Sequence, residues 1–199
     1  MDLHQINILN FGIRFASLSF FIIWKYYWHI TEKIADREKP KSDTYPKITF
    51  LRRESTTIIG IFILLQLIGW EIFPMPENPA VQVIGMLLVG IGVTMAISAR
   101  KSLGTNWNHA FEYQIKKKHK LITHGIYAYV RHPIYAGLIL SYLGIELVVE
   151  SYLFIPFFII TVTLGIIQCK REEKILSKYF GEEYTNYMKR TKMLVPLLF

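Results

Sequence analysis

Blocks of apolar residues alternate with polar segments along the 199 residues of this chain. Three long blocks lie at about 6–28, 56–73 and 80–99. Their lengths approach the roughly 20 residues that a helix needs to cross a bilayer. Two shorter blocks, at 134–149 and 152–168, are separated by only two residues, which predicts a tight helical hairpin that thins or incompletely crosses the bilayer. The pattern therefore predicts an all-α integral membrane protein with about five transmembrane helices, the last two forming a C-terminal hairpin.

Prolines and glycines refine this pattern. Pro133 suits the first turn of the hairpin's first helix, and Pro156 predicts a kink in its second helix. Three glycines in the third long block either allow another helix to approach closely or are merely tolerated there; they are Gly85, Gly90 and Gly92.

The segment after the hairpin is basic and amphipathic. From Lys170 on, Ile175, Leu176 and Tyr179 share one helical face, and Gly181 has the position of a residue that ends a helix. A second short helix then starts with acidic residues and closes with basic ones, which is the order that the helix dipole favours; these residues are Glu182, Glu183, Lys189, Arg190 and Lys192. The tail is therefore expected to form two amphipathic helices at the membrane surface.

Basic residues concentrate in the segments 29–54 and 100–132 and in the tail, whereas the turns 74–79 and 150–151 contain none. By the positive-inside rule, this distribution places the N-terminus outside and the C-terminus in the cytoplasm. Residues 1–99 would then form three N-terminal transmembrane helices. Residues 100–199 would carry the hairpin and the tail within the same structural domain, with their polar parts on the cytoplasmic face.

The first apolar block has no basic leader and no clear cleavage site, so it is interpreted as a retained span. Arg14 lies inside it, and pairing with a neighbouring helix or with the membrane interface is a simpler explanation for this arginine than catalysis.

The composition narrows the class of protein. The chain is 52% hydrophobic and 15% aromatic, with a formal charge of +8. Membrane topology and anionic lipid headgroups explain this charge more simply than nucleic acid does, so membrane lipids are expected partners and nucleic acid is not. The single cysteine, Cys169, excludes an intrachain disulfide. The three histidines of residues 119–132 lack a regular metal-ligand spacing, so no metal is expected, and the common nucleotide-binding glycine motifs are absent from the sequence.

Candidate chemistry gathers in residues 119–137. Here Arg131 and His132 precede Pro133, so they stand at the N-terminus of a membrane helix, where an anionic group would be attracted. An arginine that binds lipid phosphate and fixes the helix depth is an equal alternative. Glu172 and Glu173 follow the other arm of the hairpin and would face the same side; a solvated charged face is their simpler explanation. Because Glu172 and Glu173 are expected on the same side of the membrane as Arg131, a ligand-binding site is favoured over a solvated charged face.

Three motifs resemble one known family. They are LGxxW (Leu103, Gly104, Trp107), HxLxxxGxYxxxRHPxYxG (His119 to Gly137) and EExxxxxxFGxxYxxY (Glu172 to Tyr187). In order and spacing they resemble the isoprenylcysteine carboxyl methyltransferases and the related phospholipid methyltransferases, which are integral-membrane enzymes that use S-adenosylmethionine. The resemblance covers about half of the chain, and Lys192 stands where the family usually has an arginine.

The resemblance implies a pocket for S-adenosylmethionine between the hairpin and the tail, with a lipophilic substrate entering from the bilayer. By similarity, His119 and the Leu121 backbone would meet the methionine part, and Glu172 or Glu173 would hold the cofactor. Arg131 and Glu172 are the implied catalytic residues. Further implied pocket residues are Gly125, Tyr127, His132, Pro133, Tyr135, Tyr184 and Tyr187.

The methyl acceptor stays open at this point. A prenylcysteine carboxylate is ionised near neutral pH and needs only orientation by a cation such as Arg131. An amine must lose a proton, so Glu172 or a histidine would be the base. A thiol or small acid, an NADPH-dependent enzyme resembling the sterol reductases, and a non-enzymatic lipid-binding scaffold are the alternatives.

Overall fold

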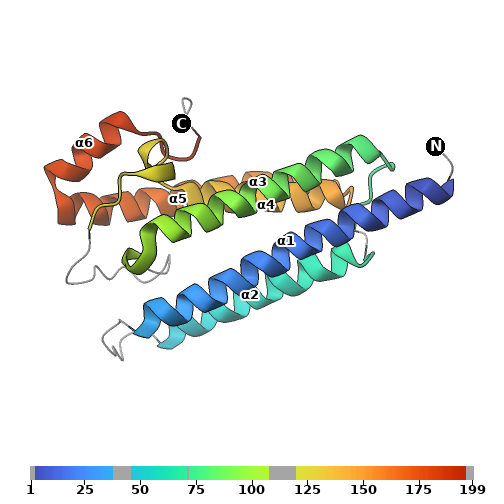
Figure 1. The fold of residues 1–199 in the computed structure, drawn as a ribbon, viewed down its shortest axis with the longest axis horizontal. Helices are drawn as coiled ribbons and strands as arrows, with labels where there is room; N and C mark the ends of the chain where they lie inside the picture. Colours follow the sequence, from blue (N-terminus) through green and yellow to red (C-terminus); the bar gives the residue numbers. More distant parts are fainter. Residues whose placement is uncertain (1–2, 38–45, 71, 108–119, 196–199) are drawn as a thin grey trace.

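The computed structural model describes residues 3–37, 46–70, 72–107 and 120–195. Six α-helices and two short 3₁₀ helices make up its regular structure (Figure 1). The helices are α1 (Leu3–Arg37), α2 (Pro46–Leu67), α3 (Pro79–Leu103), α4 (Pro133–Val148), α5 (Phe154–Phe180) and α6 (Glu182–Arg190), with η1 (Gly104–Asn106) and η2 (Gly125–Ala128). The predicted all-α class is confirmed for the described residues.

Helices α3 and α4 form the most closely packed pair, because glycines face each other along their length. A Cβ atom on Gly85 would lie 2.7 Å from the carbonyl oxygen of Gly144, and one on Gly92 would overlap the carbonyl oxygen of Gly137. The two backbones can approach this closely only where side chains are missing. Gly85 and Gly92 therefore allow α3 and α4 to approach each other closely, which is one of the two explanations that the sequence left open for these glycines.

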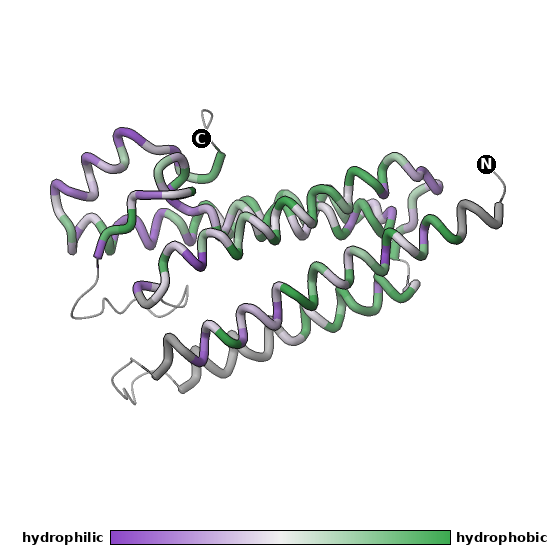
Figure 2. Tube along the Cα trace, viewed as in Figure 1, coloured by the Kyte–Doolittle hydropathy of each residue, from purple (hydrophilic) through white to green (hydrophobic). Residues whose placement is uncertain are grey.

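Helices α1 and α2 run together along one side of α3 and α4 (Figure 1). Ile13 of α1, Ile63 of α2, Val93 of α3 and Ile145 of α4 belong to one buried cluster. Apolar residues are frequent along these helices (Figure 2), and Phe11 of α1 and Ile61 of α2 are among their exposed side chains. Such a surface suits a lipid environment.

Three described helical segments are long and apolar enough to cross a membrane: Ile8–Lys33 within α1, all of α3, and α5. The apolar segment Thr57–Leu67 of α2 and the 16-residue helix α4 are shorter. An integral membrane protein is therefore confirmed, while the total of five spans and the direction of the chain across the bilayer stay predictions.

Several expected boundaries are wrong. Helix α1 continues to Arg37 and α2 starts at Pro46, so much of the expected loop 29–54 is helical, and α2 ends at Leu67 instead of near residue 73. Pro156 lies in the first turn of α5, where a proline does not force a kink.

The tail helix expected from Lys170 is not separate either, because α5 continues without interruption from Phe154 to Phe180. Charged residues are good helix formers, so leaving the apolar block does not end a helix. The expected end at Gly181 is confirmed by its φ of +57°, and α6 follows directly. Polar residues dominate this part of α5 and α6 (Figure 2).

Hydrogen bonds connect the link between α2 and α3 to the turn between α4 and α5. The backbone N–H of Tyr152 donates to the carbonyl of Phe73 at 2.9 Å. The carboxylate of Glu150 accepts hydrogen bonds from the backbone of Asn78 and, at 2.8 Å, from the amide of Gln82. Asn78 is the N-cap of α3 and its side chain accepts a hydrogen bond from Ala80, so Glu150 holds the cap residue at the start of the helix.

Arg14 contacts a neighbouring helix, which agrees with the structural explanation for this arginine that the sequence favoured over catalysis. Its Nη1 donates to the carbonyl of Gln66 in α2 at 3.5 Å, and the side chain of Gln66 donates to Glu146 of α4 at 3.3 Å. These contacts connect α1, α2 and α4.

Candidate active site

The segment before α4 pairs with the segment after α6. The backbone N–H of Arg131 donates to the carbonyl of Lys192 at 2.8 Å, and that of His132 donates to Met193 at 3.1 Å. The N–H of Lys192 returns a bond to Tyr129 at 3.2 Å. This short parallel pairing places Arg131 and His132 between α5 and α6. Pro133 then starts α4, and His132 before it has φ −125° and ψ 57°, which is outside the helical region that a following proline disfavours but also short of the extended geometry expected.

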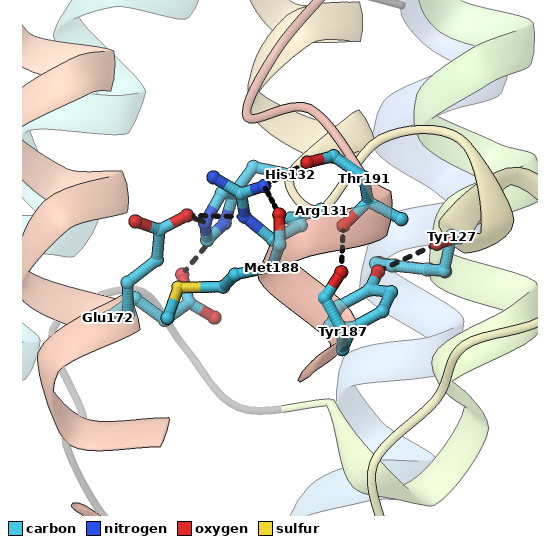
Figure 3. Close-up of polar contacts among 8 residues, drawn as sticks. Tyr127, Arg131, His132, Glu172, Tyr187, Met188 and Thr191 are labelled. Atoms are coloured by element: carbon cyan, nitrogen blue, oxygen red, sulfur yellow. Dashed lines mark hydrogen bonds and ion pairs between the residues drawn. The ribbon is translucent and has the colours of Figure 1, made fainter. Parts of the chain in front are cut away.

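Four side chains form a charged cluster at this point (Figure 3). Arg131 Nε donates to Glu173 Oε1 at 2.7 Å. The same oxygen lies 3.3 Å from His132 Nε2, and His132 Nδ1 lies 3.7 Å from Glu172 Oε2. The predicted association of Arg131 and His132 with the paired glutamates is therefore found, with Glu173 as the partner of Arg131.

The two glutamates differ in their exposure. The side chain of Glu173 is 14% exposed and that of Arg131 11%, whereas that of Glu172 is 42% exposed. A charge-assisted hydrogen bond between two such enclosed groups is stronger than one at the surface. The carboxylate of Glu173 is thus occupied by contacts within the protein, and Glu172 is the carboxylate of the pair that is accessible to a ligand.

Arg131 also holds the end of α6. Its Nη1 donates to the carbonyl of Met188 at 3.3 Å and to that of Thr191 (Figure 3). These carbonyls belong to the last turn of α6 and the residue after it, where helix carbonyls lack helical partners and a cation is favoured. The guanidinium therefore joins α5, α6 and the start of α4.

Buried tyrosines lie beside this cluster. The hydroxyl of Tyr187 donates to the carbonyl of Tyr127 at 2.7 Å, and the carbonyl of Tyr187 accepts a bond from Thr191 Oγ1 at 2.8 Å (Figure 3). The ring of Tyr184 meets that of Tyr187 edge-on at 5.8 Å. Burial raises the pKa of Tyr187 to about 12, against the opposing charge of Arg131, and also raises the pKa of Tyr127 and Tyr184. The phenols therefore stay neutral at physiological pH.

The charges and the lining of the cluster favour a cationic ligand. Two carboxylates, of which Glu172 is the more exposed, lie close to a single guanidinium in this cluster. Apolar residues pack beneath it, among them Ile139 of α4, Cys169 of α5 and Leu194. In such surroundings an accessible carboxylate attracts a cation more strongly than it would in water.

The remaining predicted site residues surround the cluster unequally. Tyr135 follows Pro133 in the first turn of α4, and its ring lies 5.9 Å from that of His132. Leu121 is half-buried, and Gly125 starts η2 with a φ of +62°. His119 lies outside the described residues. Among the described residues, no group of three or more His, Cys, Asp or Glu side chains is arranged to hold a metal ion.

Two contributions are not among the residues predicted from the sequence. The carbonyls of Met188 and Thr191 bind Arg131, but backbone groups leave no mark in a sequence. Arg100 begins the basic segment 100–132 that follows a span, yet it is 2% exposed and stacks on Trp107, the last residue of the LGxxW motif. The spacing of Arg100 from that motif is the only signal that could have identified it.

Comparisons with known proteins agree on one class. A sequence model of the phospholipid methyltransferase family matches residues 80–183. A protein-S-isoprenylcysteine O-methyltransferase of Dictyostelium discoideum is 26% identical over 195 residues, which cover 96% of this chain and 78% of the relative. The enzyme of the same name from Homo sapiens is 28% identical over 203 residues, covering 100% of this chain and 69% of the relative.

A solved structure has the same fold. The eukaryotic intramembrane Ras methyltransferase, an isoprenylcysteine carboxyl methyltransferase, superposes with a TM-score of 0.66 at 21% identity. The superposition covers 96% of this chain and 68% of the solved chain. The family match at residues 80–183 runs from α3 to the start of α6 and so includes Arg131, His132, Glu172 and Glu173.

Proposed function

This chain belongs to the isoprenylcysteine carboxyl methyltransferase family of integral-membrane methyltransferases, and we propose that it transfers the methyl group of S-adenosylmethionine to the carboxylate of a prenylcysteine or a similar lipid-like molecule. The observation that carries this proposal is the cluster of Arg131, His132, Glu172 and Glu173. It combines an accessible carboxylate for a cationic methyl donor with an arginine for an anionic acceptor.

The residues present fit such a donor. When bound, S-adenosylmethionine supplies an electrophilic methyl group on a sulfonium. Glu172, 42% exposed beside His132, can attract the positive charge or accept hydrogen bonds from the ribose hydroxyls. Tyr127 and Tyr135 line the pocket and supply rings for stacking and cation–π contact, and the buried Tyr184 and Tyr187 pack behind them. The Leu121 backbone, Gly125 and Pro133 complete the pocket, together with His119 outside the described part of the chain.

The protein's contribution is to align and desolvate the reactants. A carboxylate acceptor is already ionised near pH 7, so no base is required. Arg131, fixed by Glu173 and by α6, is the group that orients it. A displacement at a sulfonium needs no proton for the leaving group, so Glu172 acts by binding charge. Burial of the apolar residues beneath the cluster excludes water from this end of α4 and α5.

The acceptor's lipophilic part would enter sideways from the bilayer, since the outer faces of the helices are apolar. In the orientation that the positive-inside rule predicts, the cluster faces the cytoplasm, and the N-terminus lies outside. Prenylated proteins and cytosolic S-adenosylmethionine would both reach the cluster from that side.

A second acceptor class has support from the family match, because that family is described as phospholipid methyltransferases. An amine headgroup would have to lose a proton, and Glu172 is then the base, since it is the exposed carboxylate of the cluster. This alternative uses the same donor pocket and differs only in the acceptor.

The proposal is tested with purified protein in detergent. The wild type should bind S-adenosylhomocysteine in calorimetry, and Glu172→Ala and His132→Ala should weaken binding at least tenfold, whereas Glu182→Gln at the exposed start of α6 should not. Labelled S-adenosylmethionine should then methylate an N-acetylated S-prenylcysteine. Methylation of phosphatidylethanolamine alone would transfer the assignment to the amine class. Saturation by NADPH without any response to the methyl donor would overturn the proposal, as would tight unaltered binding in both cluster variants.

A further inference from the structure

A second arginine, Arg100, lies in the last turns of α3 and is 2% exposed. Its Nη1 donates to the carbonyl of Gly104 at 3.0 Å, and its Nη2 donates to the carbonyl of Thr31 in α1 at 2.9 Å. The guanidinium carbon lies 3.9 Å from the centre of the Trp107 ring and 5.9 Å from that of Trp28. A neighbouring basic residue with only a topological role would instead extend into water.

These contacts use the geometry that is particular to arginine. A planar guanidinium can bond two carbonyls in its plane while its face stacks on an indole, and a lysine ammonium cannot do both. Burying this charge is costly unless such partners are present. Arg100 therefore fixes three elements against one another: the C-terminal part of α1, the end of α3, and the turn that contains Gly104 and Trp107.

The turn that Arg100 fixes also has a conformation that few residues adopt. Gly104 has a φ of +51°, and its N–H donates to the carbonyl of Arg100. Trp107 is 6% exposed, and its ring meets that of Trp28 edge-on at 5.8 Å. The leucine, glycine and tryptophan of the LGxxW motif thus have a physical explanation: a helix end, a left-handed turn, and a ring that covers a buried cation.

Asn106 connects the turn fixed by Arg100 to the candidate site. Its Oδ1 accepts a hydrogen bond from the backbone N–H of Lys120 at 3.0 Å. Lys120 directly precedes Leu121, whose backbone belongs to the proposed donor pocket. Further along, a Cβ atom on Gly125 would lie 3.4 Å from Ser102 Oγ, so α3 also supports the start of η2. Tyr127 of η2 in turn accepts the hydrogen bond from Tyr187.

We propose that Arg100 is a positioning residue for methyl transfer, which acts through the Gly104–Trp107 turn and Asn106 to hold the Lys120–Tyr127 backbone in the geometry that binds the methyl donor. The inference rests on the proposed function and deepens it. Arg100 touches neither reactant, so its effect should fall on donor affinity and leave the chemical step intact.

Four variants separate this role from a general contribution to stability. Asn106→Ala removes only the bond to Lys120. It should raise KM for S-adenosylmethionine about three- to tenfold, the range of one net hydrogen bond, with kcat unchanged within about twofold and an unchanged thermal midpoint. Arg100→Met should raise KM further, and Arg100→Lys should rescue it partly. Lys101→Met is the matched control, because Lys101 is adjacent, carries the same charge and is exposed; its KM should equal that of the wild type.

The outcomes distinguish the two levels of the proposal. If Arg100→Met does not fold, Asn106→Ala and Arg100→Lys decide. Wild-type KM in both of these variants would overturn the positioning role while leaving the proposed function intact, and so would an equal effect in Lys101→Met. A fall in kcat without a change in KM would also overturn it. A wild type that binds no S-adenosylhomocysteine and methylates nothing would overturn the proposed function and this inference with it.

Discussion

The two adjacent glutamates provide the sharpest test of the site. Glu173→Gln and Glu172→Gln are isosteric changes of neighbouring residues on the same helix, and each removes one negative charge. We predict that Glu173→Gln loosens α6, because Glu173 orients the guanidinium that holds the carbonyls of Met188 and Thr191. Glu172→Gln should leave α6 in place and weaken binding of the methyl donor instead.

The size of the effect follows from the contact. Arg131 and Glu173 are 11% and 14% exposed and are joined by a bond of 2.7 Å. A hydrogen bond between charged groups contributes about 1.5–3 kcal/mol, and the glutamine carbonyl keeps a neutral bond of about 0.5–1.5 kcal/mol. The net loss is about 1–2 kcal/mol, which corresponds to a roughly 5- to 30-fold higher population of the opened state of α6.

Hydrogen–deuterium exchange of the peptide that covers Glu182–Arg190 measures this population directly. In Glu173→Gln its protected amides should exchange about 5- to 30-fold faster than in the wild type, and in Glu172→Gln they should exchange at the wild-type rate. The same preparations should show the reverse order for binding of S-adenosylhomocysteine. Equal acceleration in both variants, or none in Glu173→Gln, would refute the assignment of Glu173 to the fold and of Glu172 to the ligand.

Three further predictions concern helix packing, the phenol of Tyr187 and the carboxylate of Glu150. Gly92→Ala should lower the free energy of unfolding by about 1–3 kcal/mol, since its methyl group would lie 2.8 Å from a backbone nitrogen of α4, whereas Gly90→Ala, which meets only an aromatic ring at 3.4 Å, should be nearly neutral in detergent melts. The phenol bond of Tyr187 should stabilise the protein fully below pH 10 and less as pH rises toward a pKa of about 12. Tyr187→Phe should therefore cost about 1–3 kcal/mol at neutral pH and show a smaller loss of stability between pH 10 and 12. Glu150→Gln should cost about 0.5–2 kcal/mol by weakening the bonds of Glu150 to Asn78 and Gln82, and Glu77→Gln, in the turn before α3 and exposed, should cost nothing measurable in a denaturant titration.

Hydropathy predicted the helices well and their ends poorly, for a physical reason. An apolar block records where lipid surrounds the chain, but a helix continues past the membrane until a residue stops it. In α5 the charged residues after Cys169 continue the helix, and Gly181 stops it with a φ of +57°. In α1 the helix likewise passes the end of its apolar block and reaches Arg37.

The sequence predicted which residues would meet, but not how they would pair. The hairpin placed Arg131 and the two glutamates on one side, because both arms end at the same level. Neighbouring residues on a helix point about 100° apart, however, so the rotation of α5 decides which glutamate meets the arginine. That rotation depends on packing against α4, including Gly165 beside Ile139, and has no local signature.

The proposed function predicts different roles for Arg131 and His132. His132 Nε2 lies 3.3 Å from Glu173 and Nδ1 lies 3.7 Å from Glu172, so the imidazole ring lies between the two glutamates. Arg131 has five N–H donors, and its Nε and Nη1 groups bind Glu173 and α6. Within the described residues this leaves the Nη2 group for a ligand. Under the proposed function, a guanidinium held by Glu173 and α6 could bind an acceptor carboxylate without reorganising. The donor's cation and the acceptor's anion would then each meet an opposite charge on either side of His132.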